Sequence, residues 1–404
     1  MFKIALIGNM NNNLFALTRF LRDNRLDAHL FLLDNEMEHF LPEADTYDLS
    51  HLQFTHRLSF GNPYWFYNEV EKVRRFYYDE IKLLKTFDFI IACGSALGFL
   101  CYFRIGVDIF IPYGSDVLEY PFFVGSANPN HRIHLDAFCS YQKEAIIGTQ
   151  HIITTRDFTN VACYNFWIDS LDCADKIQAF DYFPFIYDKI YTPNVIPNFF
   201  SASYWFRDFS RLREQNGMLI FAHCRQAWKS VDVQTQKGND KLLEAYACVV
   251  KKFRKYNPCL VLFDYGPDVG YSKNKIKDLG VEDFVTWLPK MYRKDIMVGL
   301  YFADIACDTF SIGYTMGGVI AEVLIAHKPL ISYVDCAKFV GNPLYFHLNA
   351  YDKHEIVEQI EEGFLNREKF IEAFKGNYAW ICQSRDMVID YIKNAIYKKG
   401  SKRD

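Results

Sequence analysis

The stretch Ile312-Gly-Tyr-Thr-Met-Gly-Gly-Val-Ile-Ala-Glu322, continued by Val323-Leu-Ile-Ala-His-Lys-Pro-Leu-Ile-Ser332, decides the fold of this chain. A glycine pair opens an apolar run of helical length with a single acid, and Lys328-Pro329 ends it before a short strand. Glycine lets a ligand approach the backbone closely, and the first turn of a helix offers unpaired N–H groups to an anion. The pattern therefore predicts a site for a phosphorylated ligand whose hydroxyl groups donate to Glu322. The alternative is that Glu322 is a carboxylate placed near a helix start by the helix dipole.

Length and composition bound the class of protein. At 404 residues, of which 50% are apolar, the chain is long enough for two domains with a core each. A net charge of −4 gives no reason to expect nucleic acid as a partner. The eleven cysteines are odd in number and form no Cys-x-x-Cys pair, which argues against a disulfide framework and a zinc site. Met1-Phe-Lys-Ile-Ala-Leu-Ile-Gly8 lacks the pattern of a signal peptide, so we expect a cytoplasmic protein.

Short apolar runs alternate with helical patterns along the chain. This alternation predicts parallel sheets wrapped by helices on both faces. A proline-punctuated segment, Tyr191–Asn198, ends the first series. We expect an N-terminal domain at 1–195 joined by a C-terminal helix at 385–404, a linker at 196–212, and a second domain at 213–384. The expected strands are 2–7, 28–33, 87–93, 109–112, 151–155, 218–223, 260–264, 284–287 and 304–307.

The block 312–332 resembles the signature of the retaining glycosyltransferases of family 4 type, which have the GT-B fold. In that signature an acid and seven further residues precede a Glu on a helix that ends in a Lys-Pro strand. Glu322 and His327-Lys328-Pro329 match it, whereas Tyr314 stands in the place of the first acid. The resemblance implies two facing Rossmann-like domains with a cleft between them, and a hexosyltransferase that uses a nucleotide sugar. It also implies a donor site built from this block, with contacts from Tyr314, Thr315, Gly317, Gly318 and Glu322.

Two cations precede this block. Phe221-Ala-His-Cys-Arg225 and the segment that begins Lys237-Gly238-Asn-Asp240 resemble the family's phosphate-binding Arg and its Lys-Gly-x-Asp run. Arginine can clasp a phosphate through two parallel hydrogen bonds, while lysine acts as a mobile point charge. Arg225 and Lys237 would stabilise the charge that develops on a departing diphosphate. Because the sequence has no Asp-x-Asp triplet of the metal-dependent kind, we expect no metal and no cofactor. The alternative is that both are solvated surface cations.

The loop Gly8-Asn-Met-Asn-Asn-Asn13 follows the first expected strand. It is not the Gly-x-Gly-x-x-Gly pattern of dinucleotide sites, so nicotinamide chemistry has little support. Gly8, Asn9, Asn11 and Asn12 could instead reach the diphosphate or the hydroxyl groups of an acceptor. The alternative is that these asparagines cap the next helix.

Pro112-Tyr-Gly-Ser-Asp116 resembles the family's His-Gly-Ser/Thr-Asp motif, which lies near the reacting sugar. Tyr113 and Asp116 are therefore the candidate catalytic residues. Tyr113 takes the place of the histidine, and a tyrosine is a poor base near neutral pH because its ordinary pKa is about 10. A retaining front-face reaction needs no protein base, because the departing phosphate oxygen can accept the proton. Asp116 could instead be a turn or N-cap residue.

The aromatic segment 63–81 contains three clustered cations, Lys72, Arg74 and Arg75. It could lie on the inner face of a membrane and meet a lipid-linked acceptor, although a helix packed on the sheet is the ordinary alternative. For the whole chain, the leading hypothesis is transfer of a sugar to a glycan or lipid-linked acceptor. A nucleotide-sugar epimerase of GT-B architecture and an inactive sugar-nucleotide binding protein are the two alternatives.

Overall fold

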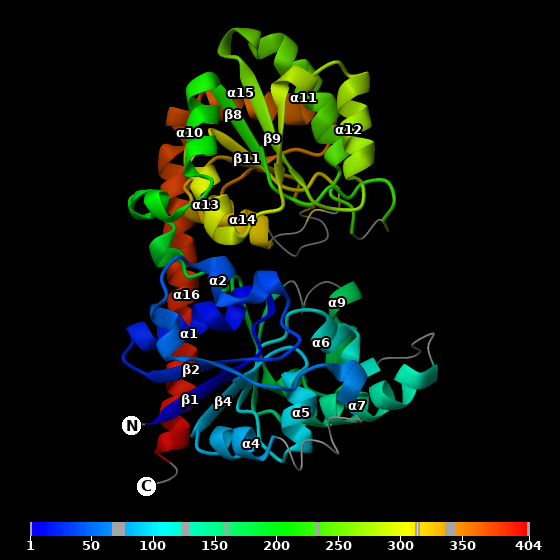
Figure 1. The fold of residues 1–404 in the computed structure, drawn as a ribbon, viewed down its shortest axis with the longest axis vertical. Helices are drawn as coiled ribbons and strands as arrows, with labels where there is room; N and C mark the ends of the chain where they lie inside the picture. Colours follow the sequence, from blue (N-terminus) through cyan, green and yellow to red (C-terminus); the bar gives the residue numbers. More distant parts are fainter. Residues whose placement is uncertain are drawn as a thin grey trace. The chain divides into compact units, whose positions relative to one another are not determined.

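The structure is a computed structural model that describes residues 2–66, 77–122, 129–156, 159, 162–231, 235–311, 313, 316–335 and 345–401. The chain divides into two compact units, one of residues Met1–Tyr187 with Gln383–Asp404 and one of residues Asp188–Cys382. The last helix, α16 (Ile371–Gly400), contributes residues to both units. Both chain ends lie side by side in the first unit, where a side chain added at Gly400 would be 3.7 Å from Phe2 (Figure 1).

The first unit is built on a seven-stranded sheet in the order β3-β2-β1-β4-β5-β6-β7. Every pairing in it is parallel, and the residues of β1 after Lys3 are buried, as expected for a sheet covered on both faces. The strands are β1 (Lys3–Ile7), β2 (Asp27–Leu32), β3 (Thr55–Arg57), β4 (Phe89–Ala92), β5 (Ile109–Phe110), β6 (His151–Thr155) and β7 (Ile177–Phe180). The helices are α1 (Asn13–Asp23), α2 (Pro42–Asp45), α4 (Tyr78–Leu84), α5 (Ala96–Tyr102), α6 (Ser115–Leu118), α7 (Pro129–Gly148) and α9 (Ala162–Ser170).

The second unit is built on a six-stranded sheet in the order β10-β9-β8-β11-β12-β13, again with parallel pairings throughout. Its strands are β8 (Met218–Ala222), β9 (Pro258–Asp264), β10 (Val285–Pro289), β11 (Ile305–Cys307), β12 (Leu330–Ser332) and β13 (Leu348–Asn349). Its helices are α10 (Phe206–Gln215), α11 (Asn239–Phe253), α12 (Val269–Asp278), α13 (Arg293–Phe302), α14 (Gly318–Ile325) and α15 (Lys353–Leu365), with the start of α16.

The predicted fold class, two α/β domains with parallel sheets, is confirmed. In each sheet the strand order reverses once, between β1 and β4 in the first unit and between β8 and β11 in the second. Open α/β sheets bind ligands at the carboxyl ends of the strands beside such a reversal. The topology therefore points to the loops after β1 and β4 in the first unit, and to those after β8 and β11 in the second.

Some predicted segments differ from the structure. Residues 196–212, expected as a linker, hold the 3-10 helix Ile196–Ala202 and the start of α10, all within the second unit. Of the aromatic segment 63–81, residues 67–76 lie outside the described part of the chain, so its membrane role stays a prediction. Among the described residues, no helix combines the length and the apolar character that a membrane crossing requires.

Candidate functional site

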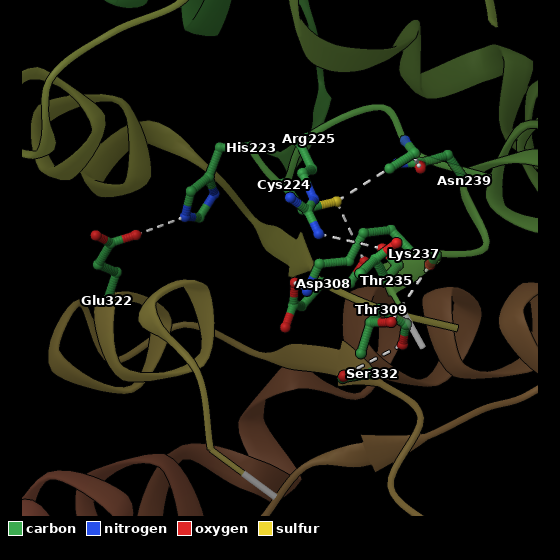
Figure 2. A network of polar contacts seen from close by, with 11 residues as sticks. His223, Cys224, Arg225, Thr235, Lys237, Asn239, Asp308, Thr309, Glu322 and Ser332 are labelled. Atoms are coloured by element: carbon green, nitrogen blue, oxygen red, sulfur yellow. Dashed lines mark hydrogen bonds and ion pairs between the residues drawn. The ribbon is translucent and has the colours of Figure 1, made fainter. Parts of the chain in front are cut away.

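Glu322 lies on α14 between two basic side chains of the second unit. Its Oε2 is 2.9 Å from Nε2 of His223, and its Oε1 accepts a hydrogen bond of 2.8 Å from Nε of Arg293. All three side chains are at least nine-tenths buried. His223 directly follows β8, and Figure 2 shows its ring pointing towards the Glu322 carboxylate. The three residues form a buried ion-paired cluster beneath the start of α14.

The charge state of Glu322 follows from these partners. Burial alone would raise its pKa, but the hydrogen bond from His223 and the positive charge of Arg293 outweigh burial and lower the pKa below the ordinary 4.5. Glu322 is therefore ionised at neutral pH, and each of its oxygens already has a protein partner, Oε2 at His223 and Oε1 at Arg293. The contact with ligand hydroxyls stays a prediction, and it would have to share these oxygens with His223 and Arg293.

Asp268 organises the loop after β8. Its carboxylate is fully buried and accepts the N–H groups of Trp228 at 2.6 Å, Lys229 at 2.7 Å and Ser230 at 3.2 Å. These backbone bonds, with the Ser230 hydroxyl, lower the Asp268 pKa to about 2 despite the opposing effect of burial. The loop that carries Arg225 is thus fixed at its far end. Arg225 itself is half-buried and donates to the Thr235 carbonyl at 3.3 Å (Figure 2).

Lys237 lies against the loop after β11. Its carbonyl accepts the N–H of Phe310 at 2.8 Å, and its Nζ is 3.6 Å from Oδ1 of Asp308. Gly238 has φ of 67° and would bring a Cβ within 2.9 Å of the Phe310 backbone, so only glycine fits this turn. Asp308 is 3% exposed and directly follows β11. The structure thus brings a lysine and a buried carboxylate to the carboxyl ends of the central strands (Figure 2).

The glycine pair marks the start of α14. Gly317 is its N-cap residue, with φ of −152°, and Gly318 is its first residue. A Cβ at Gly317 would meet no atom of the described residues within 4 Å, and its extended φ suits any residue. Neither packing nor backbone conformation therefore requires glycine here. Tyr314 and Thr315, also predicted to contact the donor, lie outside the described residues.

In the first unit, amide side chains hold the loop after β1. Asn9 is fully buried, its Oδ1 accepts the N–H of Phe15 at 2.8 Å, and its Nδ2 donates to Asn12 at 2.9 Å. Asn11 and Asn12 have φ of 50° and 63°, a conformation that asparagine tolerates better than most residues. Asn9 and Asn12 therefore shape the loop, whereas Asn11 turns its amide outward to the hydroxyl of Tyr113.

Gly8, the first residue of this loop, and Glu36 also determine its structure. Gly8, with φ of 88°, would bring a Cβ within 2.7 Å of the Cys93 carbonyl oxygen, so its absent side chain is a packing requirement. Glu36 accepts the N–H of Asn9 at 2.6 Å. Burial raises the pKa of Glu36 to about 7, against the lowering effect of the backbone hydrogen bonds from Asn9 and Leu33. Gly8 thus gives the loop its shape, and Glu36 is a titratable group that the sequence did not reveal.

Asp116 is fully buried on α6. Its oxygens accept the N–H groups of Gly114 at 2.8 Å, Tyr113 at 3.0 Å and Gly94 at 3.0 Å. Burial raises its pKa, while these backbone hydrogen bonds oppose the rise. The catalytic role of Asp116 stays a prediction, and its carboxylate has no exposed surface in this structure. Asp116 positions the Tyr113 backbone, and Tyr113 is the partly exposed member of the pair.

Three residues of this site were missed in the sequence. His223 and Asp308 each stand directly after a buried strand, and that position is the signal that could have identified them. Arg293 has no such local signal, because its partner is 29 residues away. Within the described part of the chain, no three His, Cys, Asp or Glu side chains gather as a group that could hold a metal ion.

Together, the two parallel sheets and the polar loops at their strand ends define a two-domain α/β protein. No family model matches the sequence, and no curated protein matches it either. Solved structures do match. Anabaena Alr3699/HepE in complex with UDP is 16% identical, with a TM-score of 0.60 over 97% of this chain and 100% of that chain.

Two enzymes of different activity match equally well. Sucrose-phosphate synthase from Thermosynechococcus elongatus is 13% identical, with a TM-score of 0.58 over 100% of both chains. UDP-GlcNAc 2-epimerase from Neisseria meningitidis, bound to UDP-GlcNAc, is 12% identical, with a TM-score of 0.59 over 98% of this chain and 100% of that chain. At such identities the likeness shows the fold alone. This chain has the GT-B fold, as the resemblance implied.

Proposed function

We propose that this protein is a glycosyltransferase that binds a nucleotide sugar in its second unit and moves the sugar to a glycan or lipid-linked acceptor. Gly317 is the observation that carries the proposal. Neither its backbone conformation nor its packing needs glycine, yet it stands at the N-cap of α14. A missing side chain there keeps the unpaired N–H groups of the first helical turn open to an anion. Lys237, beside the loop after β11, is a cation that suits a diphosphate.

Two cations, Lys237 and Arg225, are suited to stabilise a departing diphosphate. Lys237 is one-fifth exposed, and its ion pair with Asp308 is long at 3.6 Å, so the ammonium can turn to a phosphate while Asp308 stays behind it. Arg225 donates a hydrogen bond to the carbonyl of Thr235, two residues before Lys237. Breaking the anomeric C–O bond leaves negative charge on the diphosphate, which Lys237, Arg225 and the α14 N–H groups would stabilise. We therefore propose that the reaction needs no metal.

The reaction would proceed with retention at the anomeric centre, as in the family that the signature resembles. The acceptor hydroxyl would attack the anomeric carbon from the face that the diphosphate leaves, and its proton would pass to the departing phosphate oxygen. Tyr113 would then orient the sugar rather than act as a base. Its hydroxyl accepts a hydrogen bond from Asn11, which fixes the direction of the phenol oxygen.

Epimerisation is the second candidate function, and Asp308 favours it. This buried carboxylate at the end of β11 has one oxygen, Oδ1, without a hydrogen bond, and Lys237 is the cation beside it. Proton abstraction from a sugar carbon needs a general base, and a carboxylate can serve as one. The fold does not discriminate, because the epimerase from Neisseria meningitidis matches as well as the synthase.

One assay separates these functions. Purified protein is incubated with nucleotide sugars, with and without candidate acceptors, and free nucleoside diphosphate and sugar configuration are followed. Diphosphate release that depends on the acceptor supports the transferase. Conversion of the sugar without an acceptor would instead establish the epimerase, and binding without either reaction would establish an inactive binding protein.

The proposed role of Gly317 can be tested with a substitution and a matched control. Gly317→Val should weaken binding of nucleoside diphosphates, because its side chain would shield the first turn of α14. Gly270→Val is the control, since Gly270 lies in the first turn of α12 and also has no atom within 4 Å of an added Cβ. Both variants should fold. Equal affinity of the two variants in calorimetry would place the diphosphate elsewhere.

A further inference from the structure

A second polar site lies in the second unit, at the amino ends of the strands of its six-stranded sheet. A cavity of about 580 Å³ opens in the second unit beside Asp304, which directly precedes β11, and Lys328, which closely precedes β12. Parallel strands present all their amino ends at one edge and all their carboxyl ends at the other. The proposed donor site lies at the carboxyl ends, where Asp308 follows β11. The cavity is therefore a separate place, and the proposed function does not use it.

The wall of this cavity carries more positive than negative charge. Arg213 pairs with Asp304 through Nη1 and Oδ2 at 2.5 Å, and Nη1 of Arg367 is 3.9 Å from the other oxygen of Asp304. Asp304 also accepts the N–H of Leu219 at 2.8 Å, so this carboxylate accepts two hydrogen bonds and has a long ion pair with Arg367. One acid thus faces two guanidinium groups, before Lys328 is counted.

Lys328 is the most unusual of these groups. It is 8% exposed, and its Nζ donates to the Tyr301 carbonyl at 2.7 Å. Among the described residues, no carboxylate lies within 4 Å of this ammonium, and its two other N–H groups have no acceptor. Burial and the positive charge of Arg367 lower its pKa to about 7, although Asp304 opposes them. Burying a cation without a counter-ion is costly, and a bound anion would remove that cost.

We propose that this cavity is a binding site for a phosphate group, either free phosphate or the phosphate monoester of a small organic molecule. With Lys328 protonated, the wall holds three cations and one carboxylate, an excess of two positive charges that matches a phosphate dianion. Arginine guanidinium groups suit phosphate geometry, and Lys328 offers two unused donors. Tyr301 and Phe302 also line the cavity, so an organic body on the phosphate would meet aromatic surface.

The test is calorimetric titration of the full-length protein with sodium phosphate, sodium sulfate and glucose 6-phosphate, at constant ionic strength set by chloride. Arg367→Met removes one cation that is half exposed and only loosely paired, so this variant should fold. Lys369→Met is the matched control, because it removes an exposed cation from the same 3-10 helix, Arg367–Phe370. Lys328→Met removes the buried ammonium.

We expect saturable binding by the wild type and by Lys369→Met. Arg367→Met should bind on the order of tenfold more weakly, since a hydrogen bond to a charged group is lost. Tighter binding of glucose 6-phosphate than of phosphate would identify a phosphate ester as the ligand, and equal binding would identify the free anion. Absence of saturable binding by the wild type, or equal affinity of Arg367→Met and Lys369→Met, would overturn the proposal. Folded Lys328→Met that binds like the wild type would do the same.

Discussion

Glu322 shows how far a residue's role depends on partners that are distant in the chain. The sequence predicted a carboxylate near a helix start, whereas the structure places Glu322 at the fifth residue of α14, in contact with His223 and Arg293. Local pattern could not predict this cluster, because its members come from three separate elements. The same holds for Asp116, whose motif was recognisable but whose complete burial depends on Gly94 and the loop after β4.

Removing Glu322 should therefore affect stability before it affects binding. Glu322→Ala removes the buried carboxylate that contacts both His223 and Arg293, and breaking a buried ion pair typically costs about 3–5 kcal/mol. Urea denaturation should show this loss, while Glu322→Gln, which keeps an acceptor, should lose less. Unchanged stability together with lost nucleotide-sugar binding would contradict the structural role and favour a direct ligand contact.

Glu36 gives a prediction about pH. Its pKa is raised from 4.5 to about 7 in the folded protein, so between these values the folded state keeps a proton that the unfolded state has released. Stability then falls as pH rises through this window. Glu36→Gln cannot titrate, so its free energy of unfolding relative to the wild type should rise from pH 4.5 to 7, by at most about 1.4 kcal/mol per pH unit, and stay level above 7. A difference that does not change with pH would show that Glu36 titrates normally.

At the scale of elements, most of the fold was predictable and the short pieces were not. β1, β8 and β9 are continuous buried apolar runs, which sequence pattern detects well. β13 has two residues, too few to produce a periodic signal, and the 3-10 helix at 196–202 was read as a linker because of its proline, Pro197. Such pieces are defined by their neighbours rather than by their own sequence.

The packing of α5 on α7 gives a test at this scale. Gly98 of α5 faces Phe138 of α7 so closely that a Cβ would be 2.5 Å from the ring. Phe138 is fully buried in the core of the first unit and has little room to move. Gly98→Ala should therefore destabilise the protein by about 1–3 kcal/mol through overpacking. Gly376→Ala in α16 is the control, because an added Cβ there meets nothing, and thermal unfolding should show it to be neutral or stabilised.

At the scale of the whole molecule, the fold is shared with solved structures whose sequences are very different. No family model matches, yet structures with 12–16% identity share the architecture over nearly the entire chain. Apolar runs and strand order suffice to keep two parallel sheets, and many sequences satisfy them. In the proposed function, the chemistry instead depends on a few side chains at the strand ends, such as Lys237 and Asp308 after the central strands of the second unit.

The central claim is that the second unit binds the diphosphate of a nucleotide sugar through Lys237 and the start of α14. Its most direct test is calorimetric titration of uridine, guanosine and adenosine diphosphates and their sugars into the wild type, Lys237→Ala and the exposed control Lys251→Ala. The account predicts saturable binding of at least one nucleotide by the wild type and the control, weakened in Lys237→Ala by about 1.5–3 kcal/mol. Equal affinity of Lys237→Ala and the control, or no binding by the wild type, would contradict it.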